Sequence, residues 1–373
     1  MNTNAIAVAG LAVILAVAGV ATADVFNMGG TLDSVTGTWQ GLASLQTVRV
    51  GDPGNAADLR YTDYAFANPG GYGTVPYIYD IGKYEVTAGQ YCEFLNKVAA
   101  TDTYRLYDEI MAEPSIVFEG IQGCNIIRSG SRGSYTYSVP ADWANRPVNC
   151  VSFWDACRFA NWLHNGQPTG PQGPGTTETG AYTLNDYTGS DGRVILRNPD
   201  ARWALPTEDE WYKAAYYKGG SQDAGYWTYS TQSDTTPSNI VADGDVDPGN
   251  HANFNSWLLG TFGSPYFRTN VGECENSASP FGTFDQGGNV WEWNETIAHE
   301  EVYESEYRAY RTIRGGGYEG QLIGVNSRDI WAYPSDQSFI YGFRVVQIPE
   351  PGSIILLGTG AAIFLRKRSG KSS

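Results

Sequence analysis

The strongest constraint on the fold of this chain is a ten-residue stretch, residues 284–293, that combines glycine, aromatic and acidic residues. Its sequence is FDQGGNVWEW, and two related segments follow it, RGGGY at 314–318 and YGFRV at 341–345. Glycine allows sharp turns and positive φ, while the rings supply large areas to bury. These segments are typical of a core built from loops whose irregular backbone is held by large side chains.

The composition agrees with a loop-rich globular core. The chain has 373 residues, of which 42% are hydrophobic and 13% aromatic, and it contains 45 glycines. This is enough for one large core or two small ones, and it argues against a disordered protein. The net charge of −16 repels nucleic-acid phosphates, so DNA and RNA are excluded as partners, whereas cations and neutral sugars are compatible.

Three helices are predicted from their N-terminal capping residues. Thr87, Ser152 and Thr207 each precede apolar residues at helical spacing. Thr207 is followed three residues later by Glu210, which predicts a capping box. Short strands are predicted at residues 46–50, 77–81, 182–184 and 193–196.

Five motifs, taken in order, resemble the formylglycine-generating-enzyme-like domain. They are the EVT segment that starts at Glu85, the LPTEDEW segment at 205–211, and then GGNVWEW, RGGGY and GFRV. The resemblance covers residues 77–348 and implies an α+β fold of the C-type-lectin-like kind, loop-rich with a small antiparallel sheet. Residues 24–76 are expected to add N-terminal strands and loops. Fold alone does not settle function.

The glycine-rich turn offers a candidate calcium site. Asp285 and Glu292 are carboxylates that suit a hard cation, although spacing alone favours the plainer interpretation of an N-cap and a surface acid. The resemblance reverses this preference, because it implies calcium ligands at Asp285, Gly288, Val290 and Glu292. A second calcium site of the family would begin at Asn253, but an acidic partner downstream of it is not evident.

The family's redox site is not expected here. The resemblance places a copper-binding cysteine pair between the RGGS-like and GFR segments, where soft thiolates suit copper(I). Residues 318–341 of this chain contain no cysteine, and no cysteine follows Cys274. The three histidines are scattered and do not rebuild the iron site of the related sulfoxide synthases. We therefore assign no catalytic residue and do not expect copper.

Both ends of the chain predict export. Residues 5–21 are apolar and end in Ala21-Thr22-Ala23, which predicts a signal peptide over 1–23, with an uncleaved anchor or a buried helix as the alternative. Residues 349–373 begin with Pro-Glu-Pro, continue with an apolar run and end in basic residues. As a helix the run would reach about 18 Å, short of a ~30 Å hydrocarbon core.

The order of features at the C-terminus resembles the PEP-CTERM sorting signal. This resemblance implies transient anchoring of the short transmembrane segment, removal by an exosortase-type protease, and delivery to the cell envelope or extracellular matrix. An ordinary tail anchor is the alternative interpretation. The five cysteines, an odd number, would leave at least one thiol unpaired or paired between chains in an exported protein.

These observations favour an exported, non-catalytic domain that binds a ligand at the surface or in the matrix, with extracellular polysaccharide as the candidate partner. Arg328, Trp331 and Tyr333 lie where the family keeps its cleft, although each fits core packing equally well. Two other classes stay open. One is an oxidoreductase with a relocated metal site, and the other is a purely structural matrix protein.

Overall fold

The computed structural model describes residues 31–32, 39–40, 45–62, 67–113, 122–193, 195–239, 247–254, 263, 265–320 and 323–348. The predicted signal peptide and the predicted sorting tail lie outside these residues. Within the described ranges, no helix combines the length and the apolar character needed to span a bilayer.

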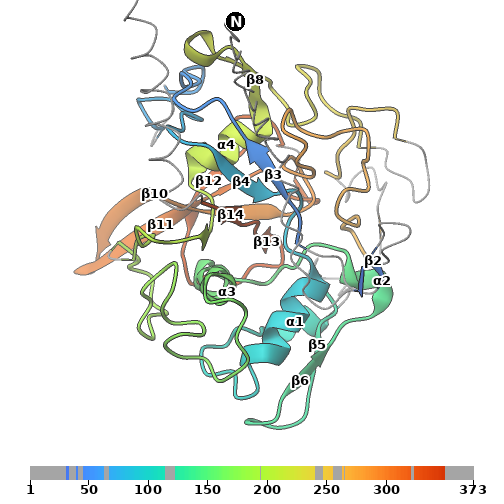
Figure 1. Cartoon of the computed structure of the whole chain (residues 1–373), viewed down its shortest axis with the longest axis vertical. Coiled ribbons are helices and arrows are strands. Elements are labelled where there is room, and N and C mark those ends of the chain that lie inside the picture. The colour runs from blue at the N-terminus through green and yellow to red at the C-terminus, as the bar shows by residue number, and fades with distance from the viewer. Residues whose placement is uncertain are drawn as a thin grey trace, which may run out of the picture.

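Two four-stranded sheets form the centre of the molecule (Figure 1). The first has the order β12-β11-β10-β13, with β10 at Trp291–Tyr303, β11 at Glu306–Arg314, β12 at Arg328–Ala332 and β13 at Tyr341–Gly342. The second has the order β3-β4-β14-β7, with β3 at Thr47–Val50, β4 at Tyr79–Gly82, β14 at Val346–Gln347 and β7 at Trp203–Ala204. Every pair is antiparallel except β10 with β13.

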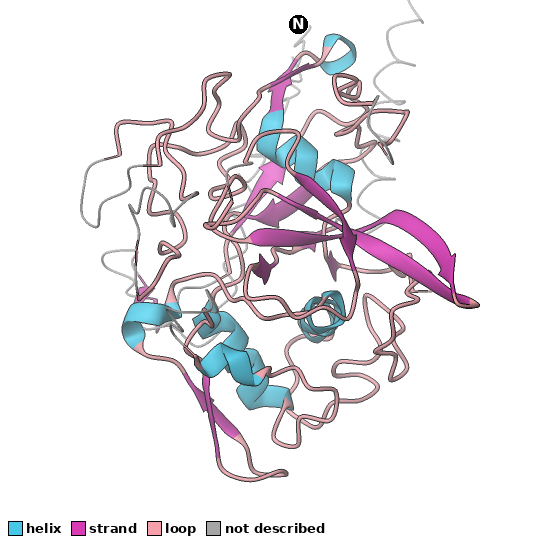
Figure 2. Ribbon diagram, turned by 180° about the vertical axis from the view of Figure 1, so that it is seen from behind, coloured by secondary structure: helices cyan, strands magenta, loops and turns pink. Residues whose placement is uncertain are grey.

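Three two-stranded pairs lie outside the central sheets. They are β1 (Thr31–Leu32) with β2 (Trp39–Gln40), β5 (Ile127–Ser129) with β6 (Thr136–Ser138), and β8 (Tyr217–Gly219) with β9 (Gly225–Tyr226). Long loops connect these elements and cover much of the molecule (Figure 2). The predicted loop-rich α+β architecture with small antiparallel sheets is confirmed.

The helices begin where their capping residues predict. They are α1 (Ala88–Val98), α3 (Phe153–His164) and α4 (Glu208–Tyr216), and Thr87, Ser152 and Thr207 close a capping box at each start. The box partners are Gln90, Asp155 and Glu210. A four-residue α2 (Ala141–Ala144) and the 3-10 helices η1 (Glu109–Ala112) and η2 (Ser221–Asp223) complete the set in the described residues.

Two of the four predicted strands are confirmed and two are wrong. Residues 46–50 and 77–81 contain β3 and the start of β4. The segments 182–184 and 193–196 hold no strand within the described residues, and only an isolated bridge joins Tyr182 to Arg197. The reason is local, because the Asn161 side chain on α3 bonds both the amide and the carbonyl of Tyr182 and so replaces a neighbouring strand.

Aromatic rings from the glycine-rich motifs fill the space between helices and sheets. Phe343 of the GFR segment meets Phe159 of α3 edge-on at 5.3 Å. The ring centroid of Trp293 in the GGNVWEW segment lies 6.1 Å from that of Phe153 and 5.1 Å from that of Tyr341. The motifs therefore fix the loops by burying large rings in one core. Away from this core, β10 and β11 project from the body as a long hairpin (Figures 1 and 2).

Candidate functional site: an arginine cavity and an aromatic hairpin face

The segment that follows RGGGY forms one wall of a cavity of ≈ 210 Å³. We call it the arginine cavity. Six of its lining residues are Tyr61, Tyr72, Arg314, Val325, Asn326 and Arg328. Three of these come from the interval in which the family resemblance places the cysteine pair.

One carboxylate holds both arginines of this cavity. Glu208, at the start of α4, accepts from Arg314 Nε at 2.8 Å and from Arg328 Nε at 2.6 Å. The ring of Tyr72 lies 4.8 Å from the Arg314 guanidinium carbon and 5.8 Å from that of Arg328. Two guanidinium groups share one carboxylate, so the wall made by these three side chains carries an excess of positive charge.

Trp331, three residues after Arg328 on β12, packs on rings of β10 and β11 and not on Glu208. Its ring contacts His299 of β10 at 5.1 Å and Tyr310 of β11 at 5.5 Å, and it is 51% exposed. Tyr333 packs on the same Tyr310 ring at 4.5 Å. The structure therefore brings Trp331 and Tyr333 together, but it does not bring Arg328 to them.

These rings continue along one side of the β10–β11 hairpin. Arg308 lies over Tyr303 at 4.3 Å, and its Nη1 donates to the Tyr333 hydroxyl at 2.9 Å. The register pairs His299 with Tyr310 and Glu301 with Arg308, so all of these side chains share one face. We call this the hairpin face, and its members are His299, Glu301, Tyr303, Arg308, Tyr310, Trp331 and Tyr333.

Glu292, one of the expected calcium ligands, is engaged in a buried ion pair. Arg344 donates to its two carboxylate oxygens at 2.6 and 2.7 Å, and Trp211 Nε1 donates to one of them at 2.8 Å. Arg344 also donates to the carbonyls of Gly82 and Phe284. Glu292 therefore joins α4, β10 and the GFR segment in the core.

Asp285 is half-buried, and no arginine donates a hydrogen bond to it among the described residues. It accepts from the Gly272 amide at 2.6 Å, and burial raises its pKa to about 6. Both carboxylate oxygens of nearby Glu85 are buried, and they have no hydrogen-bond partner among the described residues. Burial, with the charge of Asp285 second, raises the pKa of Glu85 well above its ordinary value.

The other expected ligands surround the glycine-rich turn. Asn253 accepts from the Asn289 amide at 2.8 Å through its carbonyl, and its side-chain amide donates to Asn289 Oδ1 at 3.1 Å. Gly288 has φ +102°, and a Cβ there would lie 2.3 Å from the Asn253 carbonyl oxygen, so this turn requires glycine. Val290 is fully buried.

The residues fit the expected calcium set only in part. Glu292 is committed to Arg344, whereas neither Asp285 nor Glu85 accepts a hydrogen bond from a cationic side chain within the described ranges. No three His, Cys, Asp or Glu side chains of the described residues are arranged as a metal site. Calcium thus stays a prediction, and Glu85 is the residue that sequence reasoning did not connect to it.

All five cysteines are buried and none forms a disulfide. Burial raises the pKa of each thiol, to about 12 for Cys92. The thiolate is the form that binds metals and attacks as a nucleophile, and a raised pKa keeps a thiol protonated. None of the residues that line the arginine cavity is a cysteine.

A family model described as "Sulfatase-modifying factor enzyme 1-like domain" matches residues 62–348. No curated protein sequence matches the chain. Among solved structures, CarF is 22% identical over 82% of this chain and 99% of its own, with a TM-score of 0.48. Treponema denticola variable protein 1 is 20% identical over 82% and 96%, with a TM-score of 0.49. PvdO from Pseudomonas aeruginosa is 17% identical over 82% and 95%, with a TM-score of 0.41.

Proposed function

The chain belongs to the family of sulfatase-modifying factor enzyme 1-like domains, and from that premise we propose that it is an exported, non-catalytic member that binds a ligand at the cell surface or in the matrix. The observation that carries this proposal is the make-up of residues 318–341. They contain no cysteine, and they contribute an arginine, an asparagine and a valine to the arginine cavity.

The state of the thiols elsewhere supports the same proposal. A cysteine from another segment would have to reach this cavity as a thiolate in order to hold copper(I). All five side chains are buried, and burial raises the pKa of each of them. A relocated cysteine site would therefore need a rearrangement of the core.

The hairpin face is the surface that we propose for the ligand. Trp331 and Tyr303 are 51% and 49% exposed, and an exposed group of rings on a projecting element is typical of an interaction site. Glu301 and Arg308 add an acceptor and a donor beside the rings. Aromatic faces with flanking polar groups suit the apolar faces and hydroxyls of a polysaccharide.

Binding of the full chain to an array of extracellular polysaccharides tests this proposal. Trp331→Ala is expected to weaken binding at least tenfold, because it removes the most exposed ring of the hairpin face. Val302→Ala is the matched control, since Val302 is 61% exposed on the same hairpin but points to the other face. Equal loss in both variants, or no polysaccharide bound by the wild type, would contradict the proposal.

We propose the export route from the two ends of the chain. A signal peptide over 1–23 and a sorting tail over 349–373 would release the domain after processing by an exosortase-type protease. Mass spectrometry of the protein recovered from the producing cells tests this, with Asp24 expected as the first residue and the tail absent. Recovery of the intact chain would contradict processing at both ends.

A further inference from the structure

A second cavity, of ≈ 360 Å³, lies at the N-terminal end of α3 and shares no lining residue with the arginine cavity. We call it the helix cavity. The residues that matter here are Tyr104, Trp154, Asp155, Arg158, Ser335 and Gln337. They come from three separate segments of the chain. Its volume lies at the lower end of the range for small-molecule sites.

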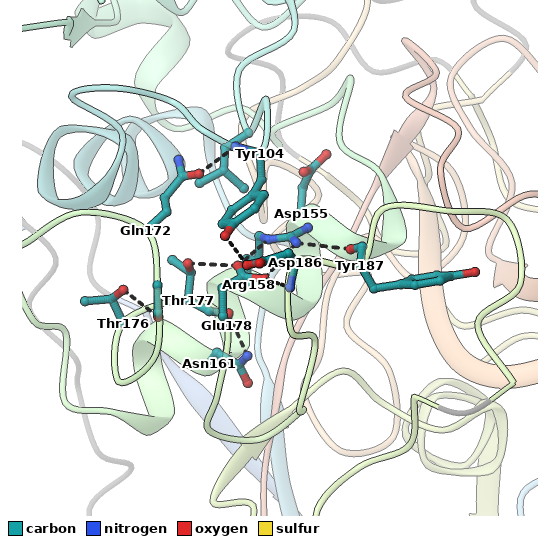
Figure 3. A network of polar contacts seen from close by, with 12 residues as sticks. Tyr104, Asp155, Arg158, Asn161, Gln172, Thr176, Thr177, Glu178, Asp186 and Tyr187 are labelled. Atoms are coloured by element: carbon teal, nitrogen blue, oxygen red, sulfur yellow. Dashed lines mark hydrogen bonds and ion pairs between the residues drawn. The ribbon is translucent and has the colours of Figure 1, made fainter. Parts of the chain in front are cut away.

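Arg158 brings a buried donor without an acceptor to this cavity (Figure 3). Its side chain is completely buried, and its Nε and Nη2 donate to Glu178 at 2.7 and 3.0 Å. Nη2 also donates to the Tyr187 carbonyl, whereas Nη1 has no hydrogen-bond partner among the described residues. A buried donor without an acceptor costs folding free energy, so an acceptor on a bound molecule would be stabilising at this nitrogen.

Asp155 brings an acceptor one helical turn earlier on the same side of α3, since residues three apart are neighbours on a helix. Its Oδ2 accepts from the Ser152 amide and hydroxyl and from Gln337 Nε2, at 2.8, 2.6 and 2.8 Å. Oδ1 accepts nothing from the described part of the chain. Burial raises the pKa of Asp155 to about 6, so the carboxylate is mostly ionised at neutral pH.

The remaining wall is rigid and aromatic. The Tyr104 ring covers the Arg158 guanidinium at 4.5 Å, and its hydroxyl bonds Asp186. Its amide donates to Gln172 at 2.8 Å, which holds this loop over α3 (Figure 3). Trp154 is buried and donates from Nε1 to the Gly189 carbonyl at 2.8 Å. The ring walls are therefore preorganised.

The charges of the site exclude a strongly charged ligand. Arg105 and Arg158 contribute two positive charges to the wall, and Asp155 and Asp186 contribute two negative ones, with Glu178 behind Arg158. An anion would meet the carboxylates, and a cation would meet the guanidinium groups. A neutral hydroxyl both donates and accepts, so it matches the unused Asp155 and Arg158 atoms together.

We propose that the helix cavity binds one neutral sugar residue, with a hydroxyl that donates to Asp155 Oδ1 and accepts from Arg158 Nη1. The inference rests on the proposed ligand-binding function, and it names the ligand class and a second subsite separate from the hairpin face.

Saturation-transfer NMR and calorimetry on the full chain test it, with glucose, galactose and mannose as neutral probes and glucuronate and glucosamine as charged probes. At least one neutral sugar is expected to bind more tightly than both charged ones. Ser335→Trp is expected to weaken binding at least tenfold, because an exposed serine at the cavity wall becomes a ring that fills it. Ser129→Trp, at an exposed serine of β5, is the matched control.

Asp155→Asn gives a second, smaller change at the proposed acceptor, with thermal melting as the check on its folding. Tenfold weaker binding in a folded Asp155→Asn protein supports the assignment. The proposal is overturned if no neutral sugar binds, if glucuronate or glucosamine binds more tightly, or if Ser335→Trp leaves binding unchanged. Loss of sugar binding in Trp331→Ala but not in Ser335→Trp would place the sugar on the hairpin face, so the two sites are distinguished.

Discussion

Buried arginines are the residues that make a loop-rich core possible. Five of the largest fully buried side chains are arginines, namely Arg158, Arg268, Arg311, Arg314 and Arg344. Each donates to at least one backbone carbonyl, as Arg311 does to Gly192 and Ile195 and Arg268 to Gln122 and Gly123. Loop carbonyls have no sheet ladder to bond, so the five-donor guanidinium supplies what regular structure would otherwise provide.

Arg344→Met is expected to lower the free energy of unfolding by about 3–5 kcal/mol, because it leaves Glu292 as an unpaired buried charge. Urea unfolding followed by tryptophan fluorescence measures the loss. Arg49→Met is the control, since Arg49 pairs with Asp80 at the surface, where such pairs contribute less than about 1 kcal/mol. A loss of the same small size in both variants would show that the Glu292–Arg344 pair does not hold the core.

Asp209 is expected to make stability depend on pH. Burial raises its pKa from 3.8 to about 6, so the folded protein holds this proton more tightly than the unfolded chain does. Its stabilising contribution is complete below about pH 4 and is lost as pH rises through 6. Asp209→Asn, which keeps an acceptor for the Gly73 amide, is therefore expected to gain stability over the wild type at pH 7.5 but not at pH 4. Urea unfolding at both values checks this, and an equal difference at both would contradict it.

At the scale of elements, the helix starts could be predicted because their signals are local. Thr87, Ser152 and Thr207 each close a capping box within four residues. The β10–β11 hairpin was missed, because its outer part projects from the body and lacks the alternation of a strand with one buried face. Residues 299–308 read HEEVYESEYR, with few apolar positions at a period of two.

Thr207→Ala is expected to destabilise the protein by about 1 kcal/mol, because it removes the hydroxyl that accepts from the Glu210 amide. Thr207→Ser keeps that hydroxyl and serves as the control in the same thermal melts. A loss in the serine variant as large as in the alanine variant would attribute the effect to the methyl group and not to the cap.

At the scale of the whole molecule, the order of the motifs could be recognised in the sequence, but the cavities could not be predicted from it. The helix cavity takes its walls from residues 103–105, 152–158, 186–188 and 335–337, and nothing in the sequence joins these segments. For the same reason Glu85 was not connected with Asp285, two hundred residues away along the chain. The different contacts of Arg328 and Trp331 also depend on how one short strand, β12, pairs with β11.

Calcium removal tests Asp285 and Glu85 as a group. If calcium binds at Asp285 and Glu85, a free concentration of 100 Kd stabilises the folded chain by about 2.7 kcal/mol. Chelation is then expected to lower the melting temperature of the wild type and to have little effect on Asp285→Asn. Identical melting of the wild type with calcium and with chelator would contradict a calcium site.

The most direct test of the central claim is an oxidation assay on the copper-loaded full chain with a cysteine-containing peptide, run beside a formylglycine-generating enzyme. Because residues 318–341 contain no cysteine and all five thiols are buried, we predict that mass spectrometry finds the peptide cysteine unchanged. Formylglycine in the peptide at a rate like that of the enzyme would contradict a non-catalytic domain.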